Sequence, residues 1–327
     1  MTDSSVSRRG FLGAAAATVG AVALSAGLAG CSESSTGQAE TATTDTTSTD
    51  AAATDTATTT PAADVKPVIM VVSFGTSYNE SRHITIGAIE DDIREAYPDY
   101  EVVRAFTADT IVDKLKKRDG REIMNVDAAF QYCIDKGVKE LVVQPTHLMA
   151  GHEYTDVQNA LEEQKANFEK TALGKPLLDT DDDYQNVMKA IVEDCKDYDD
   201  GKTAIIVMGH GTDADSNEDY SKMQQTFTDG GYKQYFVTTV EATPSFDDTI
   251  KLVKKAGFKK ALLRPFMVVA GDHATNDMAD ASSKDSLAGK CKAAGIDATP
   301  LLRGLGQVVA IDEIYVAHVK EAISALA

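Results

Sequence analysis

The chain is short of positive charge and of cysteine, and it contains no tryptophan. Its 327 residues include 32 Lys and Arg against 51 Asp and Glu, a formal net charge of -19. Because nucleic acid attracts basic surfaces, this balance argues against a nucleic-acid partner. Beyond the N-terminal region only Cys133, Cys195 and Cys291 occur, and none belongs to a CxxC pair. They permit at most one disulfide with one thiol left over, and we expect small buried residues in a reducing setting.

Large apolar residues are almost absent from residues 32–65, where Thr, Ala, Ser and Asp dominate. Such a segment cannot bury enough apolar surface to offset the entropy that it would lose on ordering. We therefore predict that residues 32–65 form a disordered tether and contain no folded element.

An apolar stretch rich in Ala and Gly, residues 11–30, precedes this tether. It follows the Arg8–Arg9 pair of SRRGFLG and ends in the sequence LAGC. These features are typical of a twin-arginine export signal with a lipoprotein cleavage site. We predict that residues 1–31 are a signal peptide and that Cys31 is lipidated. The protein would then be exported and anchored on the extracytoplasmic face of the cell membrane, in the periplasm or at the cell surface. A transmembrane anchor is the alternative.

The remainder of the chain begins its two parts with similar apolar runs. KPVIMVVSFGTS covers residues 66–77 and KTAIIVMGHGTD covers residues 202–213. Continuous apolar runs rich in Val and Ile predict buried parallel strands. Phe74 and His210 hold the same place in the two runs, 136 positions apart.

Each run is followed by a helical pattern, a second strand, a further helix and a third strand. The expected second strands are residues 100–107 and 235–244, the helices 128–137 and 247–257, and the third strands 138–145 and 258–265. This alternation predicts an α/β architecture with parallel sheets. We predict two similar doubly wound halves, residues 66–200 and 201–327, with an active-site cleft between them. Most active-site residues would lie in the second half, at the carboxyl ends of the strands.

The third strands run into a corner that the sequence uses twice. QPTHLMAGHEYTDV begins at residue 144 and RPFMVVAGDHATNDM begins at residue 264. Each contains a Pro, an apolar run, Ala-Gly and then two polar residues. His152 and Glu153 hold this place in the first half, and Asp272 and His273 hold it in the second.

In the second half, His210, Glu241 and His273 all follow expected strands or end them. His210 is flanked by glycines, which permit close approach of a ligand. We interpret Glu241 as part of an apolar strand, where burying a carboxylate without a role would be costly. Asp272 is placed to orient His273. Two imidazoles and a carboxylate suit a divalent first-row metal. The residues alone leave a metal or acid–base site and a purely structural role equally open. We expect no chemistry from His83 or His318.

Six stretches resemble the anaerobic-pathway sirohydrochlorin cobaltochelatases, which belong with the ferrochelatases to the class II chelatases. They are VVSFGTSYNESR, RAFTADTIVDKLKKRDG, VMGHGT, VEATPSFDDTI, RPFMVVAGDHATNDMA and AAGIDATPLLRGLG. The resemblance covers essentially residues 66–327, although Thr243 and the export signal depart from the family's pattern. It implies the same two α/β halves, with a cleft whose catalytic and metal-binding residues are His210, Glu241 and His273.

The resemblance further implies insertion of Co²⁺ into sirohydrochlorin with release of two protons, a step of cobalamin-type biosynthesis. His210 and His273 would hold the metal, with Glu241 as the third ligand. Fe²⁺ and Ni²⁺ are alternative metals, because ligand types overlap among these ions. Arg104 and Arg264 are candidates for contacts with the tetrapyrrole carboxylates, but we favour surface salt bridges for both.

His147 and His152 belong to the first-half corner and have two interpretations. They are either a remnant of duplication with ordinary hydrogen bonds, or a second metal or haem-ligating site at a subunit contact. The export signal also keeps a second function open, an exported carrier of haem, metallo-tetrapyrrole or metal built on the same fold. Whether the chain forms a homo-oligomer is not decided by the sequence.

Overall fold

The computed structural model describes residues 65–326. The predicted signal peptide, Cys31 and residues 32–64 of the predicted tether lie outside this range. None of the helices in the described range is long and apolar enough to cross a membrane.

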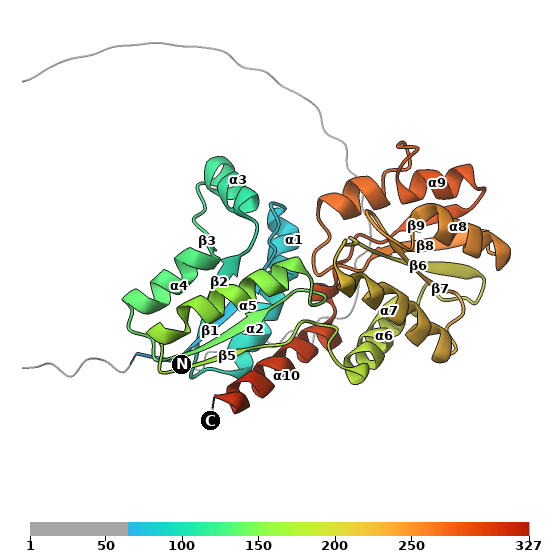
Figure 1. The fold of residues 1–327 in the computed structure, drawn as a ribbon. Coiled ribbons are helices and arrows are strands. Elements are labelled where there is room, and N and C mark those ends of the chain that lie inside the picture. Colours follow the sequence, from blue (N-terminus) through green and yellow to red (C-terminus); the bar gives the residue numbers. More distant parts are fainter. Residues whose placement is uncertain (1–64, 327) are drawn as a thin grey trace, which may run out of the picture. The chain divides into compact units, whose positions relative to one another are not determined.

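The first half is built on a five-stranded parallel sheet with the strand order β3-β2-β1-β4-β5 (Figure 1). Its strands are β1 (Val68–Ser73), β2 (Glu101–Phe106), β3 (Met124–Asn125), β4 (Glu140–Pro145) and β5 (Lys170–Leu173). Its helices are α1 (Asn79–Ile84), α2 (Ile86–Ala96), α3 (Asp109–Asp119), α4 (Val126–Asp135), α5 (His152–Gln164), the short η2 (Lys165–Asn167) and α6 (Asp181–Cys195).

The second half is built on a four-stranded parallel sheet with the order β7-β6-β8-β9. Its strands are β6 (Thr203–Gly209), β7 (Tyr235–Thr239), β8 (Lys260–Pro265) and β9 (Asp297–Pro300). Its helices are η3 (Asp215–Asn217), α7 (Glu218–Asp229), α8 (Phe246–Lys255), the π-helix η4 (Ala274–Met278), α9 (Leu287–Ala293), η5 (Leu305–Gln307) and α10 (Val309–Ala325). Two parallel α/β sheets with matching strand orders confirm the predicted fold class.

The first strand of each half is buried, apart from Thr203 at the start of β6, and its side chains alternate between two apolar clusters. In β1, Ile69 and Val71 face one cluster. Val68, Met70 and Val72 face another, which α4 and α5 complete. Burying one such side chain completely stabilises the fold by about 1.5–3 kcal/mol. This alternation explains why the sequence shows a continuous apolar run.

In β6 the same alternation joins the second half to the first. Ile205 and Val207 enter the cluster that already contains Ile69 and Val71, together with residues of α2, α6, α7 and α10. The opposite face of β6 packs with α8 and α9. The two sheets therefore share one apolar core, and each sheet has a separate core on its other face.

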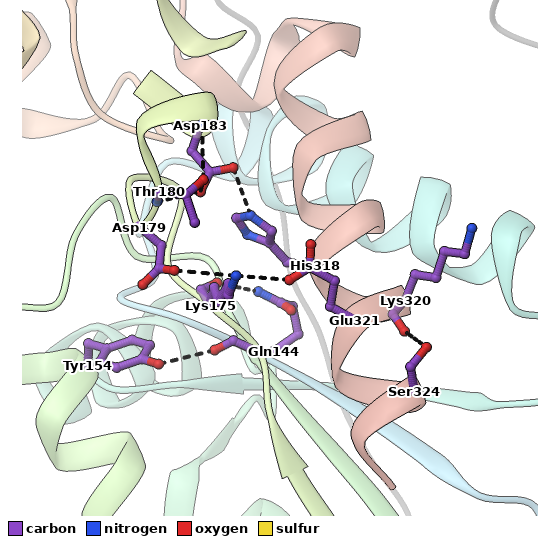
Figure 2. Close-up of polar contacts among 11 residues, drawn as sticks. Gln144, Tyr154, Lys175, Asp179, Thr180, Asp183, His318, Lys320, Glu321 and Ser324 are labelled. Carbon is purple, nitrogen blue, oxygen red and sulfur yellow. Dashed lines mark hydrogen bonds and ion pairs between the residues drawn. The ribbon is translucent and has the colours of Figure 1, made fainter. Parts of the chain in front are cut away.

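The C-terminal helix α10 follows the second sheet in sequence but packs against α2, α6, β4 and β5. The Tyr315 hydroxyl donates to the carbonyl oxygen of Thr146 at 2.9 Å. Figure 2 shows the imidazole of His318 beside the carboxylate of Asp183 at the start of α6, with Nε2 and Oδ1 3.1 Å apart. Because α6 leads from the first sheet to the second, α10 ties the first half to the connection between the halves.

The three cysteines of the described range, Cys133, Cys195 and Cys291, are buried free thiols. Each lies in a different apolar cluster. Their placement confirms the prediction that they serve as small buried residues.

Candidate active site

His210 is the first residue after β6, and the glycines on either side determine its position. A Cβ on Gly209 would lie 2.1 Å from a ring carbon of Tyr220, so only glycine fits there. Gly211 has a φ of +91° and lies close to Ala242, a backbone conformation that favours glycine. The Nδ1–H of His210 donates to the carbonyl oxygen of Gly211 at 2.9 Å. Nε2 therefore keeps its lone pair for a ligand.

His273 lies at the start of the π-helix η4, a kind of segment that often marks functional sites. Its Nδ1 donates to Oδ2 of Asp277 at 2.7 Å, which again leaves Nε2 open. The prediction that Asp272 orients His273 is wrong, because Asp272 accepts a hydrogen bond from the Tyr78 hydroxyl at 3.2 Å. Helical backbone places a residue four positions on beside the ring, whereas the adjacent residue points elsewhere.

Glu241 follows β7 and is not part of it. The backbone N–H groups of Val240 and Glu241 both donate to the carbonyl oxygen of His210, at 3.1 and 2.9 Å. The Glu241 side chain is 60% exposed, so the interpretation as a carboxylate in a buried strand is wrong. The ladder ends at Thr239 because the next two residues turn to pair with His210.

The structure brings the three side chains together at the carboxyl ends of β6, β7 and β8. The rings of His210 and His273 meet edge to face with their centroids 4.6 Å apart. Nε2 of His210 lies 3.8 Å from Oε2 of Glu241. In residues 65–326 no three His, Cys, Asp or Glu side chains already converge as a metal site. Since metal–imidazole bonds are about 2.0–2.1 Å long, the exposed Glu241 must rotate inward to complete a three-ligand site.

The first-half corner lies against the loop that follows β6. Nε2 of His152 is 2.9 Å from Oδ1 of Asp213. A Cβ added to Gly151 would lie 3.4 Å from the Ser216 hydroxyl oxygen, which shows how closely the backbone approaches. This contact places first-half residues beside the loop that begins with His210.

The second-half corner makes the reciprocal contact with the loop that follows β1. The Tyr78 hydroxyl donates to Asp272, as described above. A Cβ added to Gly271 would lie 3.3 Å from the Thr76 hydroxyl oxygen. The two halves therefore exchange equivalent contacts, and the site residues lie among them.

Glu153, at the start of α5, is a candidate that the sequence prediction did not include. Its side chain reaches water, but the surrounding protein partly desolvates the carboxyl and raises its pKa, against the opposing effect of nearby His210. A carboxyl with a raised pKa near the imidazole of His210 is suited to accept a proton. The repeated corner could have indicated Glu153 as a site residue, because Glu153 occupies the position equivalent to His273.

His147 and His152 do not form a joint site. His147 is only 8% exposed, and both of its ring nitrogens are buried without a hydrogen-bond partner in the described part of the chain. Burial lowers the pKa of His147 to about 4. His152 is exposed and is paired with Asp213. The burial of the His147 nitrogens does not favour an external haem there, and haem or metal ligation at these two residues stays a prediction.

Arg104 and Arg264 both form salt bridges, but the surface location favoured from the sequence is wrong for Arg264. Arg104 donates through Nε and Nη2 to the two carboxylate oxygens of Glu90, both at 2.6 Å. Arg264 is fully buried, and its Nη1 lies 2.7 Å from Oδ2 of Asp194. Neither guanidinium is left to hold the carboxylates of a ligand.

Two parallel α/β halves with two imidazoles and a carboxylate at the strand ends define a chelatase-type protein. The family model for cobalt chelatase (CbiK) matches residues 67–324, so the chain belongs to this family. A sirohydrochlorin cobaltochelatase of Salmonella typhimurium is 34% identical over 260 residues, 80% of this chain and 97% of the relative. The sirohydrochlorin cobaltochelatase CbiKC of Nitratidesulfovibrio vulgaris is 26% identical over 263 residues, 80% of this chain and 92% of the relative.

Solved structures agree with this assignment at the level of the fold. SirB from Bacillus subtilis with Fe³⁺ is similar with a TM-score of 0.56 at 16% identity, covering 80% of this chain and 97% of SirB. At this identity the likeness supports the fold and not the activity.

Proposed function

We propose that this chain is a sirohydrochlorin cobaltochelatase, which inserts Co²⁺ into sirohydrochlorin and releases two protons. Membership of the cobalt chelatase family carries the proposal, and two relatives that match it over most of their length bear this name. The geometry agrees, because His210 and His273 each use Nδ1 for a hydrogen bond and keep Nε2 for an incoming cation.

His210 and His273 hold the substrate Co²⁺ through Nε2, and Glu241 rotates inward as the third ligand. The carboxylate offsets part of the cation's charge. Because the three side chains are partly exposed, 47% for His210, 60% for Glu241 and 36% for His273, the cation keeps an open coordination side. There the pyrrole nitrogens replace bound water and draw the ion into the macrocycle.

Insertion exchanges two pyrrole N–H protons for one Co²⁺, so the site must accept two protons. Glu153 and Glu241 both lie near His210, which lowers the pKa of Glu153 and whose Nε2 is 3.8 Å from Oε2 of Glu241. Desolvation by the surrounding protein raises the pKa of Glu153, which makes its carboxylate a stronger base than an ordinary glutamate. We assign it the first proton, and Glu241 takes the second when Co²⁺ leaves.

The test follows the absorbance of sirohydrochlorin with Co²⁺ and the full chain, beside His210→Ala and His273→Ala. Both variants should lose at least about 100-fold in insertion rate, as expected when metal activation fails. His83→Ala, which removes an exposed imidazole on α1, is the matched control. A folded wild-type protein that binds Co²⁺ but does not exceed the uncatalysed rate would sink the proposal. A chromophore that co-purifies without turnover would favour the carrier.

Glu153→Gln tests the proton acceptor. We expect kcat to fall about 100-fold, the lower range for loss of a general base, while Co²⁺ affinity stays unchanged. Glu162→Gln on the same helix is the control, because Glu162 is exposed and pairs with Lys165, away from the site. Equal kcat values for the two variants would remove Glu153 from the mechanism.

The choice of cobalt over Fe²⁺ or Ni²⁺ rests on the family and on the names of the relatives. Parallel insertion assays with the three ions, each at several concentrations, measure the preference as a ratio of kcat/KM. We expect Co²⁺ to give the largest value, and a larger value for another ion would reassign the metal.

We also propose that the chain is exported and lipid-anchored, on the strength of Arg8–Arg9 and of Cys31 in LAGC. Cys31→Ser should move the protein from the membrane fraction to the soluble extracytoplasmic fraction. Replacement of both arginines by lysine should retain the precursor inside the cell. An unprocessed chain that stays membrane-bound in the Cys31→Ser variant would support a transmembrane anchor instead.

A further inference from the structure

Phe74 is an aromatic side chain whose place in the fold gives it significance. It is 49% exposed although it directly follows the fully buried strand β1. A single exposed apolar residue needs no explanation by itself. Two further features distinguish Phe74: its counterpart in the other half and the contacts of its loop.

Phe74 and His210 are structurally equivalent. Each is the first residue after the strand that starts its half, β1 or β6. Each is followed by a glycine with positive φ, +100° at Gly75 and +91° at Gly211. The first half thus presents a phenyl ring at the point where the second half presents a metal-binding imidazole.

The loop that carries Phe74 borders the metal site. Thr76 and Tyr78 of this loop contact Gly271 and Asp272, the two residues that precede His273. The loop after β6 makes the reciprocal contact with the first-half corner. By this exchange, Phe74 and Glu153 occupy in the first half the two places that His210 and His273 occupy in the second.

Two arginines, the buried Arg82 and the exposed Arg118, hold this loop in place. Arg82 donates through Nη1 to the carbonyl oxygen of Thr76 at 3.2 Å. Arg118 donates through Nη2 to the carbonyl oxygen of Ser77 at 2.6 Å. A backbone fixed by such charge-assisted bonds keeps a neighbouring ring in a defined place before a ligand arrives.

We propose that Phe74 stacks on the ring system of the tetrapyrrole and holds it over the second-half metal ligands. The inference rests on the proposed function and names the residue that orients its substrate. A phenyl ring gains from contact with an extended π face and does not compete for the cation. The duplicated site is therefore divided, with metal capture in the second half and macrocycle positioning in the first.

Titration of metal-free sirohydrochlorin into the full chain, followed by its absorbance, tests the inference. Phe74→Ala should raise the Kd about tenfold, as expected for removing one stacked ring, and Phe74→Tyr should bind like the wild type. Phe74→Leu, which keeps apolar bulk without a π face, should resemble Phe74→Ala. Leu252→Ala is the control, because Leu252 is 50% exposed on α8. Co²⁺ binding measured without tetrapyrrole should be the same in all of them.

In turnover, Phe74→Ala should raise KM more than it lowers kcat. If Phe74→Ala binds sirohydrochlorin as tightly as an active wild type does, the stacking role is overturned and the proposed function stands. If Phe74→Ala also loses Co²⁺ binding, Phe74 supports the fold and the stacking role is equally overturned. If the wild type neither binds nor metallates sirohydrochlorin, the proposed function fails first and the inference falls with it.

Discussion

At the scale of single residues, the two histidines of the site differ in what holds their rings. The Nδ1–H of His210 donates to a neutral carbonyl oxygen, and that of His273 donates to the carboxylate of Asp277. A carboxylate behind an imidazole fixes its orientation and makes its other nitrogen a better metal donor. We therefore expect His273 to bind Co²⁺ more strongly than an exposed imidazole that has no carboxylate behind it.

Asp277→Asn should lower Co²⁺ affinity about 10–100-fold, the usual effect of losing the partner behind a metal-binding imidazole. Equilibrium dialysis of Co²⁺ against the full chain measures it. Asp272→Asn is the matched control, since Asp272 bonds Tyr78 and not His273. A larger loss from Asp272→Asn would restore the assignment made from the sequence.

At the scale of elements, the contact between α6 and α10 is a buried polar network in an otherwise apolar core (Figure 2). The backbone N–H and hydroxyl of Thr180 both donate to Asp183 at 2.7 Å, and His318 lies against the other carboxylate oxygen. Asp183 thus caps its own helix and also holds α10. Loss of this one carboxylate leaves both partners unsatisfied.

Asp183→Ala should lower the free energy of unfolding by about 2–4 kcal/mol, because a helix cap is lost and a buried imidazole loses its partner. Urea unfolding of the full chain measures it. Asp181→Ala is the control on the same helix, since the Asp181 side chain is 91% exposed, and it should stay within about 0.5 kcal/mol. Equal costs for the two variants would show that the network does not stabilise the contact.

The contact between Asp183 and His318 also makes the stability of the fold depend on pH. Burial alone would raise the pKa of Asp183, but the hydrogen bonds from Thr180 and the nearby His318 outweigh it and lower the pKa. A carboxyl with a lowered folded-state pKa stabilises the fold above its unfolded value of about 3.9 and loses that contribution as the pH falls further. The difference in the free energy of unfolding between wild type and Asp183→Asn should therefore be largest at neutral pH and shrink below about pH 4. A difference that persists in acid would assign the effect to packing.

At the scale of the whole molecule, we expect the two sheets to unfold together, because they share one apolar core. Cys195 lies in the shared cluster, Cys133 in the outer cluster of the first half and Cys291 in that of the second. Burial raises the pKa of the Cys133 thiol to about 12 and that of Cys291 to about 11. In the folded protein, all three thiols should be unreactive.

Thiol labelling of the full chain carrying Cys31→Ser, followed across a urea series, tests this cooperativity. No thiol should react in the native state, and all three should become reactive in the transition seen by far-UV circular dichroism. Mass spectrometry identifies each labelled cysteine. Labelling of Cys133 or Cys291 well before that transition would show that one half opens by itself.

Much of the fold followed from local pattern, and the rest did not. The continuous apolar runs placed β2, β4 and β8 within two residues of their observed bounds. They also located β1 and β6, but overran the C-terminal ends of both strands by four residues. The short strands β3, β5 and β9 gave no usable signal, because two to four residues are too few for periodicity to show. The strand predicted over residues 235–244 is too long, because β7 ends at Thr239. The strand ends there because the next two residues turn to pair with His210.

The sequence by itself determined that two similar α/β halves exist and that His210, Glu241 and His273 belong at strand ends. Buried parallel strands and repeated corners depend on consecutive residues, so one sequence is enough to predict them. Only the tertiary structure decided that Asp277 holds His273, that Glu241 is exposed, and that α10 packs on the first sheet. These features depend on contacts between distant segments and on side-chain direction, neither of which sequence spacing specifies.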